Sequence, residues 1–476
     1  MISKNARTCI IATLGPASRD PDTIGELIEA GVNVFRLNFS HGDAEDHRKA
    51  VAAIREQSSR TLRPIGILQD LQGPKIRIGK FADGSIELKS GDSFTFTCDD
   101  DSPGNQERVG VTYKGLSGDV KRGDPILLDD GKLRLRVTQV RGKDVIASVE
   151  VGGRLSDSKG INLPQCDLKI PALSDKDVED IRVGAELGVD WVAMSFVRSR
   201  DDVFLAKHYM DRFGSTARIM AKIEKPSAVD RFDDILEAAD GIMIARGDLG
   251  VELSTEQVPL VQKRLIRHSR HYGKPVVTAT QMLDSMTQNP MPTRAEASDV
   301  ANAIFDGTDA VMLSGETAVG VNPVEAVRVM NTIARSVESD ESYQHAMHEE
   351  DVITDETVPD SVASAACQTA KDIGARVVVT FSSSGATALR VARQRVPFFV
   401  LAITPNEISY NQLAMSWGVN AILAEDITNS DEMVTRANEV IKKTHIAEPG
   451  DYYVITAGVP FGVSGTTNLI RVEVVQ

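Results

Sequence analysis

The stretches that decide the fold are RIMAKIE at residues 218–224 and GIMIARGD at residues 241–248. Each is an apolar run of strand length that ends in charged residues. A near-continuous apolar run indicates a strand buried on both faces, as in parallel sheets. Eight such runs, separated by amphipathic helical stretches over about 340 residues, predict a TIM (β/α)8 barrel with room for one insertion. A doubly wound open sheet is the alternative. The other six runs are CIIATLG at 9–15, VNVFRLN at 32–38, PIGILQD at 64–70, DWVAMSF at 190–196, PVVTATQ at 275–281 and AVMLSGE at 310–316.

The insertion follows the third strand. Short alternating segments such as SIELKSGDSFTF (85–96), with Gly-Asp and Asp-Gly turns, predict an all-β module from about residue 75 to about residue 167. A module inserted in a βα loop lies above the barrel mouth, where a lid would lie. The barrel pattern resumes with Ser174, the expected N-cap of a helix over 175–187 that ends at Gly188.

A separate α/β unit begins at about Thr357, with a helix over 361–374 and a strand over 376–381. The charged, poorly periodic stretch 339–357 is the expected linker. Further strands are expected at FFVLAI, AILA, DYYVITA and IRVEVV. The predicted domains are 1–73 and 169–344 for the two parts of the barrel, 74–168 for the lid and 345–476 for the C-terminal domain.

The bulk composition excludes several classes of protein. A net charge of −15 argues against nucleic acid or an anionic membrane as the partner, and 5% aromatic residues weaken a base-stacking interpretation. The four cysteines are scattered without metal-ligand spacing and indicate reduced thiols. No apolar stretch approaches membrane-spanning length. We expect a cytoplasmic protein.

The predicted strands end in polar residues, although a barrel without a site would end them in turn residues. In a TIM barrel these ends form the active site. They are Arg36, Asn38, Asp70, Lys222, Glu224, Arg246, Asp248, Thr280, Ser314 and Glu316.

Glu224 and Asp248 end adjacent strands, so their carboxylates repel unless a cation or proton intervenes. Oxygen ligation that leaves positions for water and phosphate suits Mg²⁺ or Mn²⁺. The alternative is a helix cap for one and a surface salt bridge for the other.

Lys222 lies two residues before Glu224, so both side chains point to the same face of the strand. A lysine inside a barrel needs an anion. With Arg36 and a metal it would neutralise a transferring phosphoryl group. A buried ion pair of Lys222 with Asp70 or Glu224 is the alternative. The amide of Gly247 can also face an anion.

Seven segments resemble the pyruvate kinase family in the family's order, and the resemblance covers nearly the whole chain. It implies transfer of the phosphoryl group of phosphoenolpyruvate to ADP, giving pyruvate and ATP. It also implies a homotetramer with the C-terminal domain in one interface. The segments are TCIIATLGPAS, VFRLNFSHG, MAKIEKP, MIARGDLGVE, TATQMLDSM, PTRAEASDVANAIFDG and VMLSGETAVG.

The resemblance also implies residue roles. Lys222 would stabilise the phosphoryl group, Arg36 would contact the phosphate, and Glu224 and Asp248 would hold the divalent metal. The substrate carboxylate would be received by the amides of Gly247 and Asp248 and by the hydroxyl of Thr280. Four residues resemble the family's nucleotide-side contacts: Asn38, His41, Arg77 and Lys159. Of these, Lys159 would reach in from the lid. Ser314 and Glu316 match positions near the proton-delivery path, with the donor left open.

One departure concerns potassium. Most family members hold K⁺ with groups matching Asn38, Ser40, Asp70 and the carbonyl of Leu71. Where they usually read DTKGPEIR, this chain reads DLQGPKIR, so Lys75 replaces a glutamate. An ammonium would repel K⁺ and supply the same charge, so we expect activity without K⁺.

A second departure concerns regulation. The loop Ser382, Ser383, Ser384, Gly385, Ala386, Thr387 resembles in position the family's sugar-phosphate effector loop. It carries no basic residue, and LAEDITNS (423–430) lacks the Trp and Arg that bind fructose 1,6-bisphosphate in some relatives. We expect another sugar phosphate or a nucleotide as effector, or else an ordinary capped turn.

Two other functions compete. A metal-dependent aldolase or lyase on a related barrel would lack the lid, the C-terminal domain and any need for Lys222 with Arg36. A catalytically dead sugar-phosphate sensor would have lost Lys222, Glu224 or Asp248, and all three are present.

Overall fold

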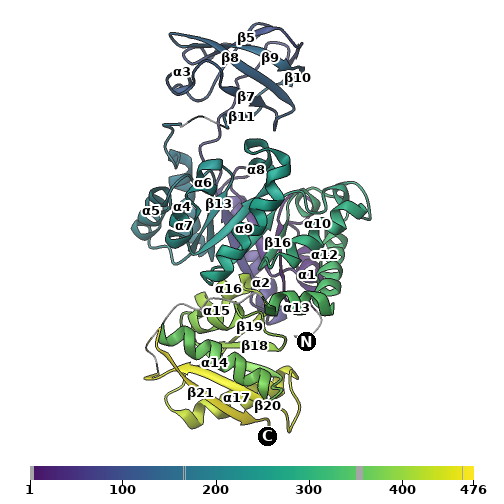
Figure 1. Ribbon diagram of the computed structural model, residues 1–476, viewed down its shortest axis with the longest axis vertical. Helices are drawn as coiled ribbons and strands as arrows, with labels where there is room; N and C mark the ends of the chain where they lie inside the picture. The colour runs from purple at the N-terminus through teal and green to yellow at the C-terminus, as the bar shows by residue number, and fades with distance from the viewer. Residues whose placement is uncertain (1–4, 165, 167, 350–356, 462, 464) are drawn as a thin grey trace.

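The computed structural model describes residues 5–164, 166, 168–349, 357–461, 463 and 465–476 of the 476-residue chain. Three bodies follow one another along its long axis: a β-rich lid at one end, a barrel in the middle and an α/β domain at the other end (Figure 1). Within these residues, no helix combines the length and the apolar character that a bilayer crossing requires.

In the described part of the chain, eight parallel strands close into a barrel in the order β1-β16-β15-β14-β13-β12-β3-β2. Each strand lies within one of the apolar runs, so the predicted TIM barrel is confirmed and the open-sheet alternative is wrong. Ala193 pairs with Asp70, and Lys222 with Met243, which brings the polar strand ends to one mouth. The strands are β1 (Cys9–Thr13), β2 (Val34–Asn38), β3 (Gly66–Asp70), β12 (Trp191–Met194), β13 (Arg218–Ile223), β14 (Gly241–Ala245), β15 (Val276–Ala279) and β16 (Ala310–Leu313).

Helices surround the barrel (Figure 1). The expected caps of α4 are present: the Ser174 hydroxyl accepts from the Asp177 amide, and Gly188 ends the helix at φ 64°. These helices are α1 (Pro21–Ala30), α2 (Ala44–Thr61), α4 (Asp175–Leu187), α5 (Arg200–Arg212), α6 (Pro226–Asp230), α7 (Phe232–Ala238), α8 (Arg246–Glu252), α9 (Val258–His271), α10 (Arg294–Phe305), α11 (Gly315–Ala318) and α12 (Pro323–Glu338), with short 3₁₀ turns η2 (Thr255–Gln257) and η3 (Asp284–Thr287).

The lid is the predicted all-β module with its own apolar core, which includes Phe94 and Phe96. A six-stranded sheet has the order β11-β7-β8-β9-β5-β6, and a two-stranded sheet pairs β10 with β4. The elements are β4 (Ser85–Leu88), β5 (Ser93–Thr97), β6 (Arg108–Gly110), α3 (Leu116–Asp119), β7 (Pro125–Leu128), β8 (Leu133–Arg141), β9 (Asp144–Val151), β10 (Gly153–Ser156) and β11 (Ile161–Asn162).

The C-terminal domain contains a five-stranded sheet in the order β19-β18-β17-β20-β21, in which only the last pair, β20 with β21, is antiparallel. Each predicted strand is found. The elements are α14 (Val358–Asp372), β17 (Val377–Phe381), α15 (Ala386–Ala392), β18 (Phe399–Thr404), α16 (Glu407–Gln412), η4 (Leu413–Met415), β19 (Val419–Leu423), α17 (Ser430–Thr444), β20 (Tyr452–Gly458) and β21 (Thr467–Val474).

The predicted linker differs from the structure in its first half. Residues Glu341–Glu349 form helix α13, and the predicted boundary between residues 344 and 345 falls inside it. Tyr343 and Met347 are buried in the barrel's apolar core, which explains why this charged stretch is helical. The second half of the expected linker, residues 350–356, lies outside the described residues.

The C-terminal domain closes the bottom of the barrel. Ala414 and Met415 of η4 belong to the same buried apolar cluster as Trp191 and Met220, whose strands form the barrel wall. The indole nitrogen of Trp191 donates to the carbonyl of Gln412 at 3.3 Å. The barrel interior is therefore filled at this end by a segment from another domain.

Candidate active site

Lys222 is the centre of the polar cluster at the barrel mouth. Its Nζ lies 3.1 Å from Asp70 Oδ1 and 3.0 Å from Glu224 Oε1. It also donates to Ser195 Oγ at 2.7 Å. Burial opposes the charge of the ammonium, but the carboxylates of Asp70 and Glu224 raise the pKa of Lys222 above its ordinary value. Lys222 is therefore a protonated, positively charged side chain at the barrel mouth.

Arg36 adds a second cation to the cluster. Its Nε donates to Asp70 Oδ2 at 2.6 Å, and its Nη1 donates to Thr13 Oγ1 at 3.2 Å. Burial alone would raise the pKa of Asp70, but Lys222 and Arg36 outweigh it and lower the pKa. Asp70 is thus a buried carboxylate that holds two cations side by side, as phosphate binding requires.

Glu224 follows β13 and Asp248 lies in the first turn of α8, after β14. Glu224 Oε2 accepts from the Phe196 amide at 2.7 Å, where Phe196 takes a left-handed φ of 56°. Burial raises the pKa of Glu224, Lys222 lowers it and Asp248 raises it again, with a net rise. The negative charge of Asp248 therefore opposes ionisation of Glu224.

This repulsion fits a divalent cation between the two carboxylates. Over the described ranges, no group of three or more His, Cys, Asp or Glu side chains is placed to hold a metal. Two protein carboxylates with remaining positions for water and substrate oxygens match the way Mg²⁺ is commonly bound.

Thr280 and Gly247 meet at the neighbouring strand ends. The Gly247 amide donates to Thr280 Oγ1 at 2.7 Å, so the predicted carboxylate receivers are hydrogen-bonded to each other. Thr280 has φ 70° and Gln281 φ 54°, two non-glycine residues in the left-handed region. Such backbone strain occurs at functional sites where surrounding structure holds it. Arg246 lies beside them and donates to the Thr280 carbonyl at 3.0 Å.

Ser314 and Glu316 lie where β16 meets α11. The buried Glu316 carboxylate accepts from the amides of Leu283, at 3.0 Å, and Ser314, at 2.7 Å. Burial raises the pKa of Glu316. The Ser314 Oγ is buried and has no hydrogen-bond partner within the described residues. Glu316 thus fixes the backbone of the loop, whereas the Ser314 hydroxyl is left without a hydrogen-bond partner among the described residues.

The residues expected on the nucleotide side are split between barrel and lid. Asn38 Oδ1 accepts from the Ser40 amide at 3.1 Å, and His41 is exposed. In the lid, Arg77 Nη1 donates to the Ser158 carbonyl at 2.9 Å, and Lys159 forms an ion pair with Asp129 at 2.7 Å. These lid contacts are internal to the lid.

Three partners were absent from the sequence prediction. Ser195 holds Lys222, the Phe196 amide holds Glu224, and Asp299 holds Arg246 through Nη1 at 2.7 Å. Ser195 and Phe196 end the run DWVAMSF, so the strand-end rule would have found Ser195. The amide of Phe196 and the partner of Arg246, which comes from α10, have no sequence signal of their own.

Comparisons with known proteins identify the family of this chain. The family description "Pyruvate kinase, barrel domain" matches residues 5–327, and "Pyruvate kinase, alpha/beta domain" matches residues 360–473. This chain belongs to the pyruvate kinase family. Pyruvate kinases transfer the phosphoryl group of phosphoenolpyruvate to ADP, giving pyruvate and ATP in the final step of glycolysis, and this chain is an enzyme of that kind.

Individual pyruvate kinases match over almost the whole chain. That of Corynebacterium glutamicum is 46% identical over 467 residues, covering 98% of this chain and 97% of its own length. That of Mycobacterium tuberculosis is 46% identical over 471 residues, covering 98% and 97%. The crystal structure of a pyruvate kinase from Cryptosporidium parvum superimposes with a TM-score of 0.94 at 34% identity, covering 100% of this chain and 97% of that one.

Two of the groups expected to match a potassium site, the Asp70 carboxylate and the Leu71 carbonyl, have partners within the protein. Asp70 holds Arg36 and Lys222, and the Leu71 carbonyl accepts from Ser195 Oγ at 2.8 Å. The side chain of Lys75 runs along Gly160, where an added Cβ would stand 3.3 Å from Lys75 Cε. Lys75 also lines a pocket with Phe196 and Lys225 of the barrel, so its side chain lies at the junction of barrel and lid.

A hydrogen-bonded cluster joins lid and barrel at the same junction. Asn162 Nδ2 of β11 donates to Glu252 Oε1 of α8 at 2.9 Å. Lys225 Nζ lies 2.5 Å from the same oxygen and 5.8 Å from the centre of the Phe196 ring. The Phe196 amide donates to Glu224, and Lys225 is the next residue after Glu224. The contact between lid and barrel is therefore linked to the Glu224 carboxylate.

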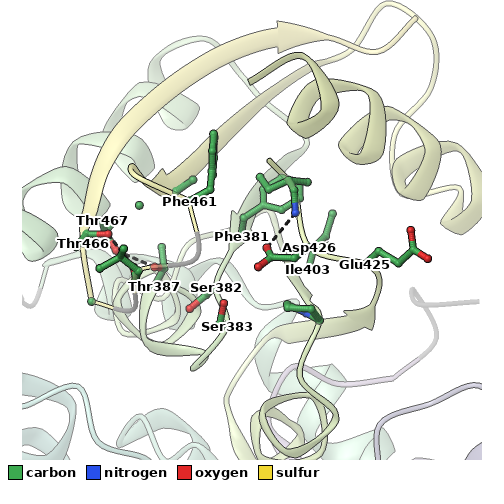
Figure 2. A pocket seen from close by; sticks show the side chains of 16 residues that line it. Phe381, Ser382, Ser383, Thr387, Ile403, Glu425, Asp426, Phe461, Thr466 and Thr467 are labelled. Carbon is green, nitrogen blue, oxygen red and sulfur yellow. Dashed lines mark hydrogen bonds between the residues drawn. The ribbon is translucent and has the colours of Figure 1, made fainter. Parts of the chain in front are cut away.

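An open pocket lies beside the loop expected to bind an effector (Figure 2). Ser382, Ser383 and Thr387 line it, whereas Ser384 and Gly385 are not among the lining residues. Hydroxyl groups lie on one side of the view and Glu425 and Asp426 on the other. The described lining residues include no lysine or arginine. The Thr387 and Thr467 hydroxyls are 2.7 Å apart.

Proposed function

We propose that this enzyme carries out phosphoryl transfer at Lys222, with Arg36 as the second cation. The observation that carries the proposal is the position of the Lys222 ammonium, within 3.1 Å of Asp70, Glu224 and Ser195 at the barrel mouth. Both cations neutralise charge on the phosphoryl group as it moves from the enolate oxygen to ADP. The Gly247 and Asp248 amides and the Thr280 hydroxyl receive the substrate carboxylate.

Glu224 and Asp248 would hold Mg²⁺ or Mn²⁺. When bound, the ion supplies positive charge against the substrate's enolate and phosphate oxygens. The protein's contribution is to fix both carboxylates: the Phe196 amide orients Glu224, and the start of α8 presents Asp248.

The lid brings in the nucleotide side of the site. Asn38 and His41 from the barrel and Arg77 and Lys159 from the lid contact ADP when the lid lies over the mouth. Lid closure also excludes water, which would otherwise accept the phosphoryl group. After transfer the enolate takes a proton at its methylene carbon, and Ser314 and Glu316 lie near that path.

A Lys222→Met variant tests the central assignment. Methionine keeps most of the apolar volume and removes the charge. We expect ADP-dependent formation of pyruvate from phosphoenolpyruvate, followed with a coupled lactate dehydrogenase assay, to fall by about 10³-fold or more. A folded variant with more than a tenth of the wild-type rate would contradict the assignment.

We further propose that activity does not require K⁺. Lys75 takes the place of the family's glutamate and lines a pocket together with Phe196 and Lys225 of the barrel. The Asp70 carboxylate is paired with Arg36 and Lys222. The assay with tetramethylammonium as the only monovalent cation should give the same rate as with K⁺. Activity that is lost in tetramethylammonium and restored by K⁺ would contradict the proposal that K⁺ is not required.

The pocket beside Ser382 and Ser383 is the proposed effector site. Its hydroxyl groups suit a phosphate, and its acidic side, with Glu425 and Asp426, repels a second one. A sugar monophosphate or a nucleotide is therefore favoured over fructose 1,6-bisphosphate. Strong activation in a titration with fructose 1,6-bisphosphate would contradict this preference.

We also propose a cytoplasmic homotetramer with the C-terminal domain in one interface. Family membership supports the assembly. The scattered cysteines, three of which are buried, support a reducing compartment. Light scattering coupled to size-exclusion chromatography gives the mass directly, and a monomer at working enzyme concentration would overturn the assembly.

A further inference from the structure

A partly buried arginine at the lower end of β13 joins this strand to the loop beside the C-terminal pocket. Arg218 is the first residue of β13, and its Nη2 donates to the backbone carbonyl of Ser384 at 2.8 Å. Its guanidinium lies over the Trp191 ring, 5.7 Å from the ring centre. A planar guanidinium held by a ring and a carbonyl fixes the two domains relative to each other at this point.

The same strand carries the catalytic cation at its upper end. Alternate residues of a strand point to the same face, so Arg218, Met220 and Lys222 form one column inside the barrel. Met220 lies in the apolar cluster of the interior, and Lys222 contacts Glu224 at the mouth. Four residues of strand span about 13 Å. Because close-packed interiors transmit strain, β13 is a route by which a shift of Arg218 would displace Lys222.

The segment that closes the barrel bottom holds the loop and the start of β13 together. Ser409 Oγ donates to the Ser383 carbonyl at 2.7 Å. Gln412 Nε2 donates to the carbonyl of Thr216, two residues before Arg218, at 2.9 Å. The loop and the lower end of β13 are thus connected both directly and through α16.

We propose that Arg218 is a positioning residue for phosphoryl transfer, which couples the loop 382–387 to Lys222 and Glu224 through β13. The proposal rests on the roles proposed above for Lys222 and Glu224. It goes beyond the effector pocket, because the coupling operates on any displacement of the loop and needs no ligand.

A double-mutant cycle tests the coupling. Gly385→Ala displaces the loop, because Gly385 has φ 77° and an added Cβ would stand 3.0 Å from Leu413 Cδ2. Arg218→Met removes the hydrogen bond to Ser384 and keeps apolar volume. We expect each single variant to lower kcat/KM for phosphoenolpyruvate about fivefold, the lower end of measured couplings between sites.

The double variant should then lose no more than either single variant, because the second change acts through a link already broken. Losses that multiply in the double variant, or an Arg218→Met enzyme within twofold of wild type, would overturn the coupling. Arg218→Lys keeps a donor for the Ser384 carbonyl and should recover most of the lost kcat/KM. No recovery counts against the proposal. If Arg218→Met does not fold, judged by circular dichroism, Arg218→Gln takes its place in the cycle.

Two controls separate the possible causes. Arg63→Met removes another partly buried arginine that donates to a backbone carbonyl, that of Ile28, and it should show no coupling to Gly385→Ala. Lys222→Met separates this proposal from the one on which it rests. An active Lys222→Met enzyme refutes the role of Lys222, whereas an inactive one combined with multiplying losses refutes the coupling alone.

Discussion

Ser195 offers a graded test of how the catalytic lysine is held. Its hydroxyl accepts from Lys222 Nζ at 2.7 Å and donates to the Leu71 carbonyl at 2.8 Å, and its residue is 3% exposed. Ser195→Ala removes both hydrogen bonds with little change in volume. Lys222 then keeps only its contacts with Asp70 and Glu224.

The expected magnitude follows from these contacts. A hydrogen bond to a charged group contributes about 1.5–3 kcal/mol. If that is lost at the transition state, kcat falls roughly ten- to hundredfold. The loss is smaller than the roughly 10³-fold or greater loss expected for Lys222→Met, because the charge itself remains. The unpaired Leu71 carbonyl should also lower the free energy of unfolding by about 1–3 kcal/mol.

The assay is steady-state kinetics with phosphoenolpyruvate and ADP, together with urea unfolding. Ser269→Ala is the matched control, since Ser269 is fully buried and its hydroxyl donates only to the Leu265 carbonyl in the described structure. The control should lose stability but not kcat. A Ser195→Ala enzyme with kcat within twofold of wild type, or one as inactive as Lys222→Met, would contradict this role of Ser195.

Three further predictions concern the lid, the monovalent cation and pH. Asn162→Ala removes the lid's hydrogen bond to Glu252 and should raise KM for ADP roughly three- to tenfold; an unchanged KM with a folded lid would show that the contact does not position it. Lys75→Glu restores the family's usual charge and should create a K⁺ requirement, seen as activity in K⁺ but not in tetramethylammonium; equal rates in both would count against Lys75 as the substitute cation. Burial raises the pKa of Asp190 to about 6, above its ordinary 3.8, despite the ion pair with Arg55. A carboxyl group whose pKa is higher in the folded state stabilises that state when it is protonated. This stabilisation is fully present below pH 3.8 and is lost as the pH rises through about 6. Relative to Asp190→Asn, the wild-type enzyme should gain roughly 2 kcal/mol of unfolding free energy from about pH 7 to about pH 4.5, and parallel pH profiles of the two proteins would contradict this.

Sequence patterns predicted most of the fold because its strands are buried on both faces. The runs around Lys222 and Asp248 have few alternatives once eight of them recur, and the strand-end rule then collects the polar residues at one mouth. Strand periodicity alone predicted that Lys222 and Glu224 face the same side, whereas their ion pair was the alternative interpretation. These are local signals, readable without knowledge of the tertiary contacts.

What the sequence did not reveal depends on contacts between distant segments. The helix over Glu341–Glu349 forms because Tyr343 and Met347 pack in the barrel core. The charged composition of this stretch does not predict that contact. The Phe196 amide acts through a left-handed backbone, which has no side-chain signature. The role of Lys75 as a substitute for K⁺ depends on its charge when substrates are bound, and it stays a prediction.

The segment that closes the barrel bottom has a consequence for synthesis on the ribosome. Barrel strands and helices, up to residue 349, are translated before Ala414 and Met415 exist. At about 5–20 residues per second, the interval is roughly 3–13 s. During it the nascent barrel has an open apolar end around Trp191 and Met220, a surface of the kind that chaperones retain. Slow codons placed after residue 349 should therefore prolong chaperone association, whereas slow codons placed after residue 415 should not.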